Sequence, residues 1–164
     1  MVTLRKKIMS SQKGFTLVEL LVVFTIMSMI TAMSIITFSS YNRTQIFKTT
    51  VSDVTDSLNL VRSRAISRVK PSVCGTKPLQ GYEFWYPVPP ASNYYRISVL
   101  CGGTYNILYR VSLPANVTFT TPSGTTTFFN VSTGTVSTPT TITLSGYGKT
   151  ATISVGQTGV VSVQ

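Results

Sequence analysis

The residue types and spacing that could support chemistry occur together near the amino terminus. Gly14 is followed by Phe15, and Glu19 is the fifth residue of the run that begins at Phe15. A peptidase that cuts after Gly14 would meet no side chain at that position. The cut would create a new α-amino group on Phe15, and this cation in one subunit can neutralise Glu19 in a neighbour. The pattern favours cleavage followed by assembly through a charge pair that sets axial register.

The apolar segment around Glu19 admits two other interpretations. Residues 15–38 hold no other charge and no Gly or Pro, and these 24 residues can span a bilayer, for which about 20 suffice. A plain membrane anchor would leave the carboxylate without a partner, which is costly. An ordinary secretory signal peptide would be cut after the run, where residues 32–36 offer no convincing small-x-small site. Four basic residues ahead of the segment favour keeping that end in the cytoplasm: Arg5, Lys6, Lys7 and Lys13.

A helical pattern continues beyond the apolar segment. Apolar residues recur at spacings of three and four, which predicts a stripe along one side of a helix that packs on a globular head. The helix should end near Val69, because Lys70 precedes Pro71. The stripe consists of Phe47, Val51, Val54, Leu58, Val61 and Ala65.

Residues 71–164 change to a pattern of strands and turns, rich in Thr, Val, Ile and aromatic residues and bounded by Gly, Pro and Asn. One candidate strand alternates apolar with more polar residues, although Leu108 breaks its polar side. The segment 154–161 predicts a terminal hairpin. The predicted fold class is α+β, with a long N-terminal α-helix packed on an antiparallel β-sheet head. The candidate strands are Tyr82–Tyr86, Tyr94–Cys101, Tyr105–Leu113, Val117–Thr120, Thr126–Val131, Thr141–Ser145, Ala151–Val155 and Val160–Val163.

The run from Lys13 to Val23, K-G-F-T-L-V-E-L-L-V-V, resembles the class III signal of type IV pilins and pseudopilins. The resemblance implies that residues 1–14 are a prepilin leader peptide. A prepilin peptidase would cut after Gly14 and N-methylate Phe15, and Glu19 would form the assembly salt bridge.

The same resemblance implies a domain organisation and a location. Residues 15–38 would form the transmembrane or filament-core half of the helix, residues 39–70 its amphipathic half, and residues 71–164 the β-rich head of a pilin-like fold. The implied partners are the prepilin peptidase, other pilin subunits through the N-terminal helix, and the cytoplasmic membrane. The chain would be single-pass with its head outside before assembly, and part of an extracellular pilus or a periplasmic pseudopilus afterwards. Residues 58–66 and the predicted hairpin are similar to the GspH/FimT family of minor pilins and pseudopilins.

Composition argues against catalysis. The chain has no His, and 14 Lys and Arg stand against four acidic residues, a formal net charge of +10. His is the usual general base near neutral pH, no nucleophile has an evident base, and two separated cysteines cannot build a metal site. We therefore predict a non-enzyme without a cofactor. Cys74 and Cys101 would form a disulfide in an oxidising exported environment, and the alternative is two buried thiols.

Three functions remain open at this point. The chain could be a structural subunit, with a minor pilin favoured, of a type IV pilus-like filament, or a pseudopilin of a type II secretion system. It could also be a minor pilin whose head captures DNA for uptake. Candidate phosphate contacts are Lys77, Arg96, Arg110 and Lys149, with Tyr94, Tyr95 and Tyr105 available for base stacking. The alternative for this basic charge is solubility alone.

Overall fold

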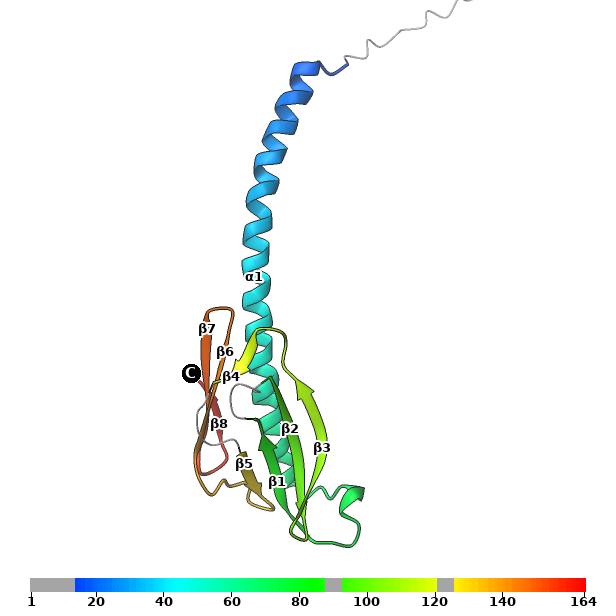
Figure 1. The fold of residues 1–164 in the computed structure, drawn as a ribbon, viewed down its shortest axis with the longest axis vertical. Helices are drawn as coiled ribbons and strands as arrows, with labels where there is room; N and C mark the ends of the chain where they lie inside the picture. Colours follow the sequence, from blue (N-terminus) through cyan, green and yellow to red (C-terminus); the bar gives the residue numbers. More distant parts are fainter. Residues whose placement is uncertain (1–13, 88–92, 121–125) are drawn as a thin grey trace, which may run out of the picture. The chain divides into compact units, whose positions relative to one another are not determined.

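The structure is a computed structural model that describes residues 14–87, 93–120 and 126–164, with residues 32–37 described by their backbone alone. The chain divides into two compact units, Met1–Tyr41 and Asn42–Gln164. The predicted leader, apart from Gly14, lies outside the described residues. Helix α1 (Leu17–Ile66) runs through both units (Figure 1).

The first unit contains the N-terminal part of α1. The hydroxyls of Thr25, Ser28 and Thr31 each donate a 2.8 Å hydrogen bond to a backbone carbonyl of the same helix, on Val22, Thr25 and Met27 respectively. Because the helix itself satisfies these hydroxyls, they add little polarity to its surface. Within the described part of the chain, no helix reaches the length and apolarity of a membrane span. The predicted span 15–38 includes residues 32–37, whose side chains lie outside the described residues.

The predicted apolar stripe fixes the later part of α1 to the rest of the second unit. All six of its side chains, from Phe47 to Ala65, are buried, which confirms the prediction. They join one core with inward-facing residues of the strands, among them Tyr82, Phe84 and Ile142. Burying a Val, Leu or Phe side chain contributes roughly 1.5–3 kcal/mol. Burial of the stripe therefore stabilises the packing of this part of the helix on the sheets.

Helix α1 ends at Ile66, three residues before the predicted end near Val69. Arg68 adopts a left-handed conformation with φ 53°. Its N–H donates to the carbonyl of Ala65, and the N–H of Val69 donates to the carbonyl of Arg64. These two bonds form a Schellman cap, which stops the helix before the Pro71 restriction applies. The sequence had predicted only Pro71 as the cause of helix termination, and the Schellman cap is a second cause that acts earlier in the chain.

Two four-stranded sheets complete the second unit (Figure 1), where the sequence had predicted one sheet without dividing its strands. The first sheet has the order β3-β2-β1-β5 and the second has the order β4-β6-β7-β8. Every neighbouring pair is antiparallel. The elements after α1 are η1 (Ser72–Cys74), β1 (Leu79–Trp85), β2 (Tyr94–Cys101), β3 (Thr104–Ser112), β4 (Val117–Phe119), β5 (Thr126–Asn130), β6 (Thr140–Gly146), β7 (Lys149–Val155) and β8 (Val161–Val163).

Strand β3 departs from the simple alternation that the sequence indicated. Ile107 pairs with Ser98 and Tyr109 pairs with Ile97, so Leu108 is an extra residue at a bulge. The bulge turns Leu108 against the core and leaves Ile107 57% exposed. The predicted apolar face of this strand is therefore split between the two faces of the sheet.

The predicted terminal hairpin is present as β7 and β8, with Val155 paired to Val161. In the turn, the N–H of Gly159 donates to the carbonyl of Gly156 over 2.8 Å. Gly159 has φ +75° and packs so closely on the loop at Gly134 that an added Cβ would lie 2.0 Å from the Gly134 carbonyl oxygen. Arg62 of α1 donates from Nη2 to the carbonyl of Thr158 over 3.2 Å. The side chain of Arg62 thus holds the hairpin turn through the backbone carbonyl of Thr158.

Candidate functional site

The first candidate site is the junction between Gly14 and Phe15. Both residues precede α1 and lie in non-helical backbone. A Cβ added to Gly14 would meet no atom within 4 Å, and Phe15 is 82% exposed. A peptidase binds its substrate in an extended conformation, which a helical segment could not supply. The bond after Gly14 thus lies in non-helical backbone next to an exposed side chain, and cleavage at this bond stays a prediction.

Glu19 lies in the first turn of α1 and takes part in a helix cap. The backbone N–H of Glu19 donates to Oγ1 of Thr16 over 3.2 Å, with Thr16 directly before the first helical residue. Thr followed three residues later by Glu is the capping-box pattern. A carboxylate there also interacts favourably with the helix dipole. Thr16 therefore caps the helix through the backbone of Glu19, and the intersubunit role of the Glu19 side chain stays a prediction.

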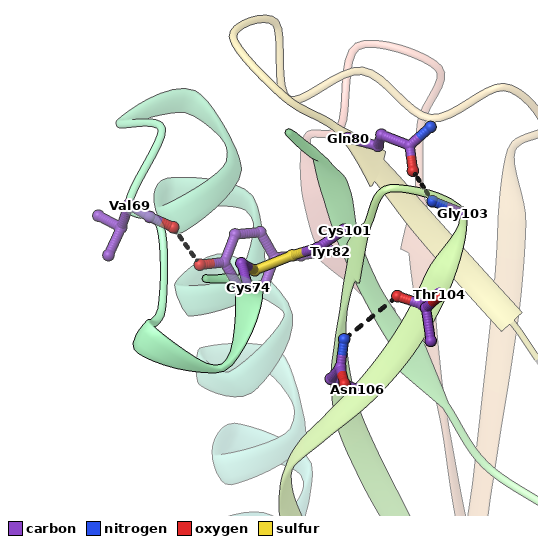
Figure 2. The surroundings of a disulfide bond; sticks show 8 residues. All are labelled: Val69, Cys74, Gln80, Tyr82, Cys101, Gly103, Thr104 and Asn106. Atoms are coloured by element: carbon purple, nitrogen blue, oxygen red, sulfur yellow. Dashed lines mark hydrogen bonds between the residues drawn. A yellow bond between two sulfur atoms is a disulfide. The ribbon is translucent and has the colours of Figure 1, made fainter. Parts of the chain in front are cut away.

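The two cysteines meet at one end of the first sheet. Figure 2 shows Cys74 of η1 joined to Cys101 at the end of β2, with their Cα atoms 5.5 Å apart. Both side chains are buried. The hydroxyl of Tyr82 donates to the carbonyl of Val69, and this bond holds the segment after α1 against β1. A bridge across 27 residues contributes about 3 kcal/mol in the chain-entropy model.

Two of the four predicted phosphate contacts come together on the first sheet. Arg96 of β2 and Arg110 of β3 are direct cross-strand partners. The guanidinium of Arg96 lies over the ring of Trp85 at 4.0 Å from its centroid, and that of Arg110 lies over Tyr94 at 4.2 Å. The two rings are themselves neighbours, with centroids 5.9 Å apart. We call these four side chains the arginine–aromatic ladder.

The other predicted contacts lie elsewhere. Lys77 is in the loop between η1 and β1, and Lys149 begins β7 in the second sheet. Tyr95 was wrongly expected to stack on a ligand, because it is buried and its hydroxyl is hydrogen-bonded to Ser57 at 2.9 Å. Tyr105 is exposed but pairs with a different part of β2, five residues along β3 from Arg110. The structure therefore does not gather the four cations, and DNA binding stays a prediction.

Glu83 is a feature that the sequence analysis missed. It lies on β1, pairs with Ser98 of β2 and is only 6% exposed. Burial raises the pKa of the Glu83 carboxyl above its ordinary value, while Arg96 and the Ser98 hydroxyl act in the opposite direction. Oε2 of Glu83 has no hydrogen-bond partner among the described residues. The strand signal at Tyr82–Tyr86 could have revealed this burial, because it was apolar on both sides of the glutamate.

A long N-terminal helix packed on antiparallel sheets, preceded by an accessible Gly-Phe bond and with a glutamate in its first turn, defines a pilin-like protein. The prokaryotic N-terminal methylation motif matches residues 9–35, and the family of type II transport protein GspH matches residues 50–159. The second match covers 110 of 164 residues, so the chain belongs to the GspH family of pseudopilins. No curated protein and no solved structure gives a match. This family is structural and non-enzymatic, in agreement with the sequence analysis.

Proposed function

We propose that this chain is a pseudopilin of a type II secretion system, made as a prepilin and assembled with other pseudopilins through its N-terminal helix. The observation that carries the proposal is the order of the two family matches, a methylation motif over residues 9–35 and a GspH domain over residues 50–159. This evidence favours the secretion pseudopilus over the type IV pilus subunit that the sequence analysis placed first.

The exposed surface of the N-terminal part of α1 supports assembly by burial. Large apolar side chains such as Leu17, Phe24 and Met29 are all more than half exposed. An apolar surface of this extent marks a site covered by lipid or by another protein. We place residues 15–38 in the cytoplasmic membrane before assembly and among neighbouring helices in a periplasmic pseudopilus afterwards.

Deleting the gene in its host should test the assignment. A pseudopilin supports secretion, so the deletion should reduce extracellular levels of a type II substrate several-fold and leave surface pili at normal numbers. The measurement is immunoblotting of culture supernatant together with electron microscopy of the same cells. A plasmid copy should restore secretion. Lost pili with normal secretion would instead assign the chain to a type IV pilus.

Glu19 provides a second prediction, which separates its two roles. In Glu19→Gln the backbone N–H can still donate to Oγ1 of Thr16, but the negative charge is gone. If the charge pairs with the α-amino group of a neighbour, Glu19→Gln should be processed normally and should be nearly absent from isolated pseudopili. The measurement is the ratio of mutant to wild-type subunit in sheared filaments, judged by immunoblotting.

A matched variant, Thr16→Val, removes the cap acceptor and keeps the charge, so it should assemble far better than Glu19→Gln. Normal incorporation of Glu19→Gln would remove the intersubunit role and leave Glu19 as a capping residue only.

A further inference from the structure

We infer that the outer face of the first sheet, centred on the arginine–aromatic ladder, is a docking surface for an acidic segment of a different protein. Trp85 and Arg96 alternate along their strands with the core residues Phe84 and Ile97, which puts them on the face turned away from the core. Trp85, Arg96 and Arg110 are aligned across β1, β2 and β3. In the neighbouring row, Glu83 is aligned with Ser98 and Ile107. The inference extends beyond filament assembly, which uses the N-terminal helix.

The charge of this part of the chain determines the charge of the partner. Residues 58–164 contain one acidic residue, Glu83, and that residue is buried. The acidic side chain nearest the ladder therefore lies within the sheet and is not offered at the surface. A second copy that presented the same face would bring like charges together, so that face-to-face approach would be repulsive. The basic residues of this region are Arg62, Arg64, Arg68, Lys70, Lys77, Arg96, Arg110 and Lys149.

The geometry of the ladder suits carboxylate groups. Like charges directly opposite on neighbouring strands destabilise a sheet, and Arg96 and Arg110 are so placed. Stacking on Trp85 and Tyr94 restricts both guanidinium groups, which lowers the entropy lost when they bind. A guanidinium accepts a carboxylate through two parallel hydrogen bonds. Glu83 already offsets part of the charge of Arg96, so an anionic partner would relieve the remaining repulsion chiefly by binding Arg110, whose guanidinium is already oriented.

The surroundings of the ladder favour a protein over a nucleic acid. One face of each ladder ring is already occupied by a guanidinium, so less ring surface remains for base stacking. Among the residues that the structure describes, two cations gather here, and two could neutralise few phosphates. In the neighbouring row lies the apolar side chain of Ile107, which is 57% exposed. Protein–protein interfaces are enriched in Arg, Trp and Tyr next to apolar surface, and this face has that composition.

The test is site-specific photo-cross-linking of the full-length chain in its host. A benzophenone amino acid replaces Ile107, and a control chain carries it at Thr141, which is exposed on β6 of the second sheet. Cross-linked peptides are identified by mass spectrometry. We expect the Ile107 probe, but not the Thr141 probe, to label an acidic segment of one other protein.

Charge reversal then tests the ladder itself. Arg110→Glu, on an exposed edge position, should lower the cross-link yield about tenfold or more, because a close charge pair becomes a repulsion. Lys149→Glu makes the same change of charge on the other sheet and should leave the yield unchanged. Arg110→Lys, which keeps the charge, should retain most of it. The amount of subunit in the membrane and the extent of cleavage before Phe15 are measured for each variant, to confirm that it folds and is processed normally.

Four results would overturn the inference: no cross-link from Ile107, a cross-link that survives Arg110→Glu, a cross-link to a second copy of this chain, or one to DNA. The last of these would restore the DNA-binding prediction made from the sequence. Secretion is measured in the same strains, so a failure of the docking surface is distinguished from a failure of the pseudopilin assignment.

Discussion

Replacing Gly14 with Leu should convert nearly complete processing into almost none. An added Cβ at Gly14 would meet nothing within 4 Å, so the substitution does not disturb the chain itself. The effect must arise in the peptidase, which would have to accommodate a branched side chain next to the bond that it cuts. Mass spectrometry of the membrane fraction should find wild-type subunits that begin at Phe15 with a methylated amino group. Gly14→Leu should remain as the full-length precursor.

The control for this prediction is Gly14→Ala, which adds a single methyl group and should be processed to an intermediate extent. Two outcomes would contradict the prediction. One is wild-type processing of Gly14→Leu, and the other is a wild-type mature chain that begins at Ser34 or later, as a secretory signal peptide would give.

The second large effect is expected from Gly159→Ala in the C-terminal hairpin. The substitution combines a left-handed backbone, φ +75°, with a Cβ 2.0 Å from the carbonyl oxygen of Gly134 and 3.0 Å from Nε of Arg62. Left-handed strain costs roughly 1–2 kcal/mol and forced overpacking roughly 1–3 kcal/mol more. The free energy of unfolding should therefore fall by about 3 kcal/mol. Urea unfolding in detergent can be followed by the fluorescence of Trp85, the one tryptophan of the chain.

Gly148→Ala is the matched control, because Gly148 has φ +73° and an added Cβ there would meet nothing within 4 Å. It should cost only the backbone strain, roughly 1–2 kcal/mol. Equal losses in the two variants would mean that the loop at Gly134 yields to the new side chain, and the hairpin turn would then not be rigidly held.

Much of the fold follows from local pattern in the sequence. The stripe from Phe47 to Ala65 predicted the buried face of α1 because helical periodicity depends only on near neighbours. Strand β2 was predicted with the bounds that the structure shows. The division into two sheets could not be predicted in this way, since it depends on which distant strands pair. In the sequence, the bulge at Leu108 was indicated only by a break in the alternation of apolar and polar residues.

The candidate sites likewise combine features that are local in the sequence with features that depend on strand pairing. The signal around Gly14 is local, and the helix cap at Thr16 could also be predicted from the sequence, because Thr16 and Glu19 have capping-box spacing. It was overlooked because Glu19 was interpreted only as a partner for another subunit. The ladder depends on the register between β2 and β3, which places Arg96 opposite Arg110. Sequence alone therefore listed these two arginines with Lys77 and Lys149 and could not tell that two belong together.

The single buried acid of residues 58–164 has a consequence for titration behaviour. This region holds no His, and its two cysteines are joined, so Glu83 is its one side chain that could change charge between about pH 4 and pH 9. Burial does not screen this charge, and Glu83 interacts with Arg96, so protonation of Glu83 would raise the positive potential at the ladder. The other side-chain charges of this region stay constant across that range. An acid-triggered gain or loss of contacts here would therefore originate in Glu83 or in the groups of the partner.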